Sequence, residues 1–241
     1  MLSRKVVEIG SGRGSCERAQ GNSPGDLPDV PVMPETLLLM DLSAQEESVD
    51  LEKMTLVVLS DPGATIQIFR LAARERAFGE ERPNRMEDCI SALGVQACVE
   101  AVSRRTISRA KDKPVIVQAW SHARETAENC KVIAEELAEN VGPNEAYLTG
   151  LLHELGSLPT ILEWEPTAAV SSDPVFAGLK LAEEWFLPQC VVDYFSELLN
   201  LKAADQWTGI LRQAHKMSES PTFGSPLDDK QESRVIAFGK S

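Results

Sequence analysis

His153 and Glu154 are adjacent within the apolar stretch of residues 146–156, and they are the residues best placed to do chemistry. A neighbouring histidine and carboxylate on a helix is how one large class of phosphohydrolases begins its metal site. A hydrolytic metal site needs several ligands that converge on one ion and leave positions open for water and substrate. The pair therefore indicates hydrolysis only if further ligands reach it.

The chain has two other histidines, His122 and His215. His122 lies near the start of a long helical pattern and could meet His153 and Glu154 if the two helices pack together. A complete site would need one more carboxylate or histidine from a later helix, and nothing after His153 presents one in a recognisable context. We therefore expect hydrogen-bonded core groups, no catalytic residues and no cofactor. If a metal is bound, its expected ligands are His122, His153 and Glu154.

The composition of the chain excludes several functional classes. The 241 residues are 43% hydrophobic, as in ordinary soluble globular proteins, and carry a formal net charge of −13. That charge argues against nucleic acid and against an anionic membrane surface, because both are bound by clustered Lys and Arg. Five scattered cysteines without a CxxC pair suit reduced thiols, and no apolar run is long enough to span a bilayer. We expect a cytoplasmic protein.

The two ends of the chain differ in composition from the rest. Residues 1–30 are rich in Gly, Ser, Pro and Asp, which predicts a flexible tail, and residues 218–241 have a similar composition. Within the first segment, residues 6–14 resemble a strand entering a glycine-rich turn, as in methyltransferases that bind S-adenosylmethionine. Such a turn works only with a following helix and a parallel sheet. Prolines follow instead and no strand–helix alternation appears, so the tail is the favoured interpretation.

Helical periodicity runs from Leu37 to Met217 with no hairpin signal, which predicts an all-α protein. Asp61-Pro62 is a strong helix start, since Asp caps free amides and Pro suits the first helical position. The predicted helices cover residues 37–42, 51–60, 62–79, 86–93, 95–110, 115–140, 146–156, 175–185, 188–199 and 203–217.

The longest of these helices carries a stripe of small side chains. Ala123, Ala127, Cys130 and Ala134 recur at three- and four-residue steps between residues 115 and 140. A second helix can approach such a face closely. The predicted helix of residues 146–156 follows a break at residues 142–144. It is expected to contain His153 and Glu154 and to end at Gly156.

Six short motifs occur in a fixed order: Asp61-Pro62, Phe69-Arg70-Leu71-Ala72, Ala92-Leu93-Gly94, Trp120-Ser121-His122, Gly150-Leu151-Leu152-His153-Glu154-Leu155-Gly156 and Leu181-Ala182-Glu183-Glu184-Trp185-Phe186-Leu187-Pro188. In this order they resemble the HDOD family, an all-helical and mostly non-catalytic relative of the HD metal-dependent phosphohydrolases found in bacterial signalling proteins. The resemblance covers about residues 32–217. It implies a multi-helix, HD-like bundle over residues 31–217, with a small lobe at residues 31–113 and an HD-like lobe at residues 114–217.

The chain departs from the family pattern at three places. Ala73 stands where the family often has Asn, and Pro174 stands where a His commonly precedes the Leu-Ala-x-x-Trp motif. Leu198 and Leu199 occupy the place of a pair of histidines. The resemblance therefore implies a member that has lost polar or ligand groups.

The resulting expectation is a non-catalytic bacterial regulatory domain, whose partner is a signalling protein or a nucleotide second messenger. Candidate binding residues are His122, His153, Glu154, Trp120 and Phe186. The alternative is an HD-type phosphodiesterase that uses His122, His153 and Glu154 to hold a metal and activate water.

Overall fold

The computed structural model describes residues 30–46, 48–103, 114–137, 140–164, 173–200 and 206–218. The glycine-rich segment of residues 6–14 and the two predicted tails, apart from residues 30 and 218, lie outside these described residues.

Every regular element in the described residues is helical, which confirms the all-α prediction. The helices are α1 (Pro34–Ala44), α2 (Leu51–Leu59), α3 (Pro62–Arg74), α4 (Met86–Leu93), α5 (Val95–Ser103), α6 (Pro114–Leu137), α7 (Pro143–Leu151), α8 (Leu158–Ile161), α9 (Pro174–Glu184), α10 (Gln189–Leu198) and α11 (Gln206–Met217), with a 3₁₀ turn η2 (Leu155–Ser157).

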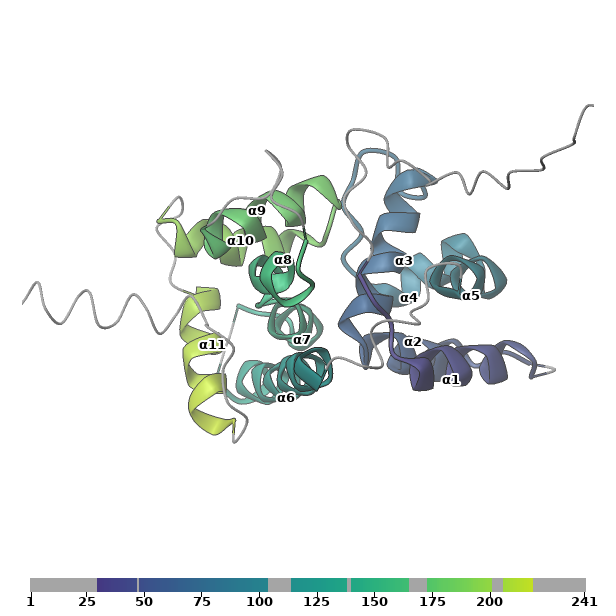
Figure 1. The fold of residues 1–241 in the computed structure, drawn as a ribbon, viewed down its shortest axis with the longest axis horizontal. Helices are drawn as coiled ribbons and strands as arrows, with labels where there is room; N and C mark the ends of the chain where they lie inside the picture. The colour runs from purple at the N-terminus through teal and green to yellow at the C-terminus, as the bar shows by residue number, and fades with distance from the viewer. Residues whose placement is uncertain are drawn as a thin grey trace, which may run out of the picture.

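The helices form two groups that lie side by side, α1–α5 in one and α6–α11 in the other (Figure 1). One continuous cluster of buried apolar side chains includes members of both groups. Within the second group α7 packs against α6, and α11 contacts both helices. This arrangement brings the middle of α6, the end of α7 and α11 together.

The close approach of α6 and α7 depends on small side chains. Ala123, Ala127, Cys130 and Ala134 on α6 are all buried, as the small-residue stripe predicts. Gly150 of α7 faces them so closely that an added Cβ would lie 2.7 Å from Cα of Ala127. The main chains of the two helices therefore touch.

His153 and Glu154 do not lie on a helix, and this corrects the sequence-based expectation. Helix α7 ends at Leu151, and the pair lies in the turn between α7 and η2. After Leu151 the α-helical hydrogen bonds give way to tighter i→i+3 bonds: the amide of Leu155 donates to the carbonyl of Leu152 at 3.1 Å, and the amide of Ser157 donates to that of Glu154 at 2.8 Å. Gly156 does not end the helix either. A Cβ added at Gly156 would lie 1.7 Å from the carbonyl oxygen of Pro174, so only glycine allows this close approach.

Helix α3 is also shorter than expected. It ends at Arg74 instead of near Gly79, because Arg76 adopts a left-handed conformation with φ of 50°. The amide of Ala77 then donates to the carbonyl of Ala72, which closes the end of the helix.

Two polar side chains connect the two groups of helices. Asp61 caps α3 and also accepts a hydrogen bond from Nε1 of Trp120 on α6, at 3.0 Å. Arg82 donates to the carbonyl oxygens of Ala182 at 3.2 Å and Leu187 at 2.8 Å, which belong to the end of α9 and the segment after it. Trp120 precedes His122 by two residues, so the Asp61 contact fixes the part of α6 that carries the candidate site.

In the described part of the chain, no single helix has both the length and the apolar character needed to cross a membrane. Helices α2 and α3 meet this test only as a pair, and they are bent by 116° at their junction.

Candidate functional site

Three histidines from three different elements meet in the second group of helices. His122 comes from α6, His153 from the turn after α7, and His215 from the last turn of α11. The ring centroids are 5.2 Å apart for His122 and His153, 5.4 Å for His122 and His215, and 4.9 Å for His153 and His215. One ring nitrogen of each residue lies within 4.8 Å of the other two.

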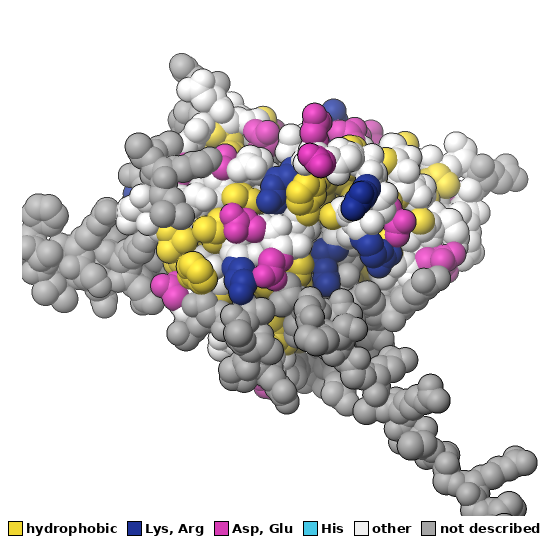
Figure 2. Space-filling view, turned by 90° about the horizontal axis from the view of Figure 1, so that it is seen from above, with side chains coloured by type: hydrophobic (Ala, Val, Ile, Leu, Met, Phe, Trp, Pro, Cys, Tyr) yellow, Lys and Arg dark blue, Asp and Glu magenta, His cyan; other side chains and the backbone are white. Residues whose placement is uncertain are grey.

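The cluster is largely inside the protein. His122 and His153 are fully buried, and His215 is half-buried. In the view of Figure 2, no histidine of the described residues is visible, and acidic and basic side chains are mixed with hydrophobic ones on that face. His215 is the member through which solvent can reach the cluster.

Hydrogen bonds fix the orientation of His153. Its Nδ1 lies 2.6 Å from the carbonyl oxygen of Gly150, and a carbonyl can only accept, so Nδ1 carries the proton. In the neutral ring, Nε2 then carries a lone pair and can accept a hydrogen bond. Nε2 lies 3.1 Å from Nε2 of His215.

His122 has a different environment. Within the described residues, neither of its ring nitrogens has a hydrogen-bond partner, although the side chain is fully buried. Its Nε2 lies 3.9 Å from Oε1 of Glu154, which is also buried. A buried polar group without a partner is unusual in a folded protein and calls for an explanation.

Burial keeps the imidazoles of His122 and His153 neutral. It lowers the pKa of His122, and the nearby Glu125 carboxylate opposes this only in part. Burial also lowers the pKa of His153 well below its ordinary value, and the neighbouring His215 and His122 lower it further. Both side chains are therefore uncharged at neutral pH and have nitrogen lone pairs available to accept a proton or to bind a metal ion.

A small cavity lies beside Glu154, and none of the three histidines lines it. Its volume is about 20 Å³, and it lies among Trp120, Leu152, Glu154 and residues of α3, α6 and α8. That volume suits one water molecule.

The other two candidate residues, Trp120 and Phe186, make contacts with residues distant in the sequence. Trp120 is buried and donates to Asp61, so it positions α6. Phe186 is half-buried, and the guanidinium of Arg82 lies 4.7 Å from the centre of its ring. Trp185 is buried against Trp164, with 6.1 Å between ring centroids.

Sequence reasoning gave no role to His215, which the structure places beside His153. A usable signal was present in the amphipathic pattern of α11. Leu211 and Ala214 are buried, and His215 follows Leu211 by four residues, which places it at the edge of the buried face. The pattern could thus place His215 on an inward-facing edge, but not against His153.

Comparisons with known proteins agree with this fold. The model of the HDOD domain family matches residues 30–172, more than half of the chain. A crystal structure of the MmoQ response regulator from Methylococcus capsulatus is 22% identical, with a TM-score of 0.58 over 80% of this chain and 89% of that one. A fragment of MmoQ is 21% identical, with the same TM-score over 78% of this chain and 82% of that one. At these identities the likeness shows the fold alone. No curated protein matches the sequence.

Proposed function

Because the chain belongs to the HDOD domain family, we propose that it is a non-catalytic, cytoplasmic signalling domain that acts by binding a protein partner. One observation carries the proposal: a set of large apolar side chains exposed on α1 and α2. We name Leu38, Leu39, Leu42 and Leu56 the α1–α2 surface.

The side chains of the α1–α2 surface are 59%, 48%, 52% and 63% exposed, in the same order. Leu42 lies one turn from both Leu38 and Leu39, so the three form a continuous strip along α1. Grouped apolar side chains at the surface of a protein commonly mark an interaction site. This strip is suited to the centre of an interface.

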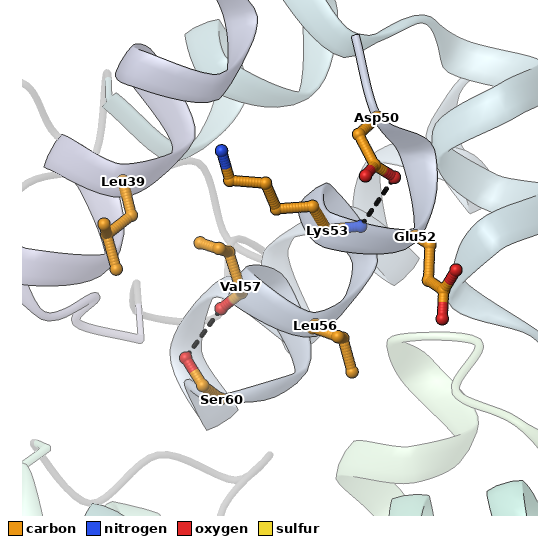
Figure 3. Close-up of a pocket in the computed structure, with 7 residues that line it drawn as sticks. All are labelled: Leu39, Asp50, Glu52, Lys53, Leu56, Val57 and Ser60. Atoms are coloured by element: carbon orange, nitrogen blue, oxygen red, sulfur yellow. Dashed lines mark hydrogen bonds between the residues drawn. The ribbon is translucent and has the colours of Figure 1, made fainter.

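The surface is hollowed between the two helices. A depression of about 420 Å³ is lined by Leu39 from α1, by Leu56 and Val57 from α2, and by Ser60, which follows α2 (Figure 3). Asp50, Glu52 and Lys53 complete its lining. A partner's apolar side chain can enter this hollow and gain affinity there.

The charges around the surface indicate the chemistry of the partner. Asp41, Asp50 and Glu52 are exposed acidic residues on α1, at the start of α2 and within it, and Lys53 is paired with Glu46 at 2.5 Å. The whole chain carries a net charge of −13. An amphipathic helix with apolar anchors and Lys or Arg along its edges matches both features.

Two further points support binding instead of turnover. The 20 Å³ cavity beside Glu154 is too small for a nucleotide or a phosphoester. The structural relative MmoQ is a response regulator, which accords with a role in signalling.

Partner capture with matched variants tests this proposal. The double variant Leu39→Gln, Leu56→Gln removes apolar anchors while keeping good helix formers, and Phe176→Gln changes a 51% exposed side chain on α9. We expect wild type and Phe176→Gln to retain the same partner and the double variant to lose it. A synthetic basic amphipathic helix from that partner should then bind wild type directly. Retention by the double variant would contradict the proposal.

A substrate screen tests the enzymatic alternative. The purified protein is incubated with nucleotides, cyclic dinucleotides and phosphoesters, with and without added divalent metals. We expect no turnover. Hydrolysis at ordinary enzymatic rates that is lost in the His153→Ala variant would replace the binding proposal with the phosphodiesterase, and tight binding of a cyclic dinucleotide without turnover would replace the protein partner with a second messenger.

A further inference from the structure

The three-histidine cluster is a set of ligand atoms built from separate parts of the chain. His122, His153 and His215 come from α6, the turn after α7 and α11, and one nitrogen from each lies within 4.8 Å of the others. Two nitrogens bound to the same zinc ion, each at about 2.0–2.1 Å, lie within roughly 4 Å of one another. His153 and His215 already meet this condition at 3.1 Å, so small rotations of the rings complete the set.

The surroundings of His153 match those of a metal ligand. A histidine that binds a metal through one nitrogen usually donates its other N–H to a carbonyl or carboxylate, which fixes the ring. The Nδ1 of His153 donates to the carbonyl of Gly150 in this way, and its Nε2 faces the cluster. The hydrogen bond to the main chain of α7 thus fixes the ring of His153 in an orientation in which Nε2 can bind a ligand.

The environment of His122 also calls for a ligand. The side chain is fully buried, and neither ring nitrogen has a hydrogen-bond partner in the described part of the protein. An ion held between the three rings would satisfy one of these nitrogens. The carboxylate of Glu154, 3.9 Å from Nε2 of His122, would offset part of the ion's charge.

We propose that His122, His153 and His215 bind one divalent transition-metal ion, Zn²⁺ in the first instance, and that the ion fastens α11 to α6 and α7. An all-imidazole set favours zinc and similar metals over magnesium, calcium and manganese, which prefer oxygen ligands. The ion's role is structural or regulatory, because its ligands lie largely inside the protein: His122 and His153 are fully buried, and His215 is half-buried. His215, half-buried at the end of α11, provides the route by which the ion enters.

Metal titration of the full chain tests this proposal. The chain contains three histidines in total, so protein purified without a histidine tag has no other imidazole ligands. After the metal is stripped with a chelator, we expect Zn²⁺ to bind with one ion per chain in calorimetry. Co²⁺ should give visible absorption bands of a nitrogen-ligated site without the near-ultraviolet bands of cobalt bound to thiolate. Thiolate bands would assign the ion to the cysteines and overturn the proposal.

Matched variants in α11 locate the ion. His215→Gln removes the half-buried ligand, whereas Lys216→Gln makes the same replacement at the next, exposed residue. We expect His215→Gln to weaken Zn²⁺ binding roughly 100-fold or more, and Lys216→Gln to leave it unchanged. Circular dichroism of the metal-free variants checks that both are folded.

Stability of α11 provides a second measurement. Zn²⁺ should raise the thermal midpoint of wild type and Lys216→Gln and should slow hydrogen exchange in α11, and it should do neither in His215→Gln. Absence of Zn²⁺ binding to wild type, or equal binding to wild type and a folded His215→Gln variant, would show that the cluster is only a group of packed core histidines.

Discussion

At the scale of the residue, Asp61 is a side chain that joins three separate parts of the molecule. Its Oδ1 accepts hydrogen bonds from the amides of Gly63 and Ala64, at 2.8 and 3.1 Å, and from Nε1 of Trp120. Its Oδ2 accepts from the amide of Met33 at 2.7 Å. One buried carboxylate thus satisfies the start of α3, the segment before α1 and the middle of α6.

Replacing Asp61 by Ala should cost about 2–3 kcal/mol of unfolding free energy, because a helix cap is lost and further buried donors are stranded. Asp50→Ala is the matched control. Asp50 also caps a helix, but it is exposed and accepts from the amide of Lys53 at 3.1 Å. It should cost about 0.5–1 kcal/mol. Urea denaturation measures both values, and equal losses would show that the long-range bonds of Asp61 contribute nothing.

Only part of these residue contacts could be predicted. The capping role of Asp61 follows from Asp61-Pro62, because capping is local and has a sequence signature. Its bond to Trp120 spans 59 residues and depends on how α6 packs against α3. The same limit applies to His215, which meets His153 across 62 residues, and no pattern within α11 specifies that partner.

At the scale of the element, the packing of α6 on α7 holds two of the three histidines in place. Gly150 both makes the close contact and accepts the hydrogen bond from His153. Its Cβ position lies 2.7 Å from Cα of Ala127 and 3.0 Å from Sγ of Cys130. A side chain at residue 150 would therefore press on the main chain of α6, which can move only if the whole helix shifts.

Gly150→Ala should therefore destabilise the protein by about 1–2 kcal/mol, since overpacking outweighs the better helix propensity of alanine. Gly209→Ala is the control, because no atom lies within 4 Å of a Cβ at that position in α11. It should stabilise by up to about 1 kcal/mol. Opposite signs in thermal or urea unfolding support the packing argument, and stabilisation by both substitutions would refute it.

Elements with strong periodicity and clear end signals could be predicted from the sequence. The predicted helix of residues 86–93 is found as α4, and its stop at Gly94 is real, because Gly94 has a φ of 83°. Gly156 also suggested a helix end, but glycine is needed there for a different reason. The carbonyl oxygen of Pro174 lies so close to Gly156 that no side chain fits. A glycine pattern does not distinguish a helix stop from a tertiary contact, and the turn that holds His153 and Glu154 was missed for that reason.

At the scale of the whole molecule, Arg82 connects the two groups of helices at a second place. Its two backbone hydrogen bonds reach residues about a hundred positions later in the chain, and its guanidinium stacks on Phe186. Burial lowers the pKa of this guanidinium, but an arginine remains charged at neutral pH. Neither the hydrogen bonds nor the stacking of Arg82 could be predicted from the sequence. The sequence indicates the order of the helices, but it does not indicate which loop of the first group contacts the end of α9.

Arg82→Lys should weaken this connection. A lysine keeps the charge but cannot make both forked hydrogen bonds and the planar stack at once, so we expect a loss of about 1–2 kcal/mol. Because the contact links two groups of helices, unfolding followed by tryptophan fluorescence and by circular dichroism should no longer coincide. Arg85→Lys is the control, since Arg85 makes an exposed ion pair with Glu87 and should cost less than about 0.5 kcal/mol. If Arg82→Lys behaves like Arg85→Lys in both measurements, the two groups are held together by the apolar core and Asp61 without help from Arg82.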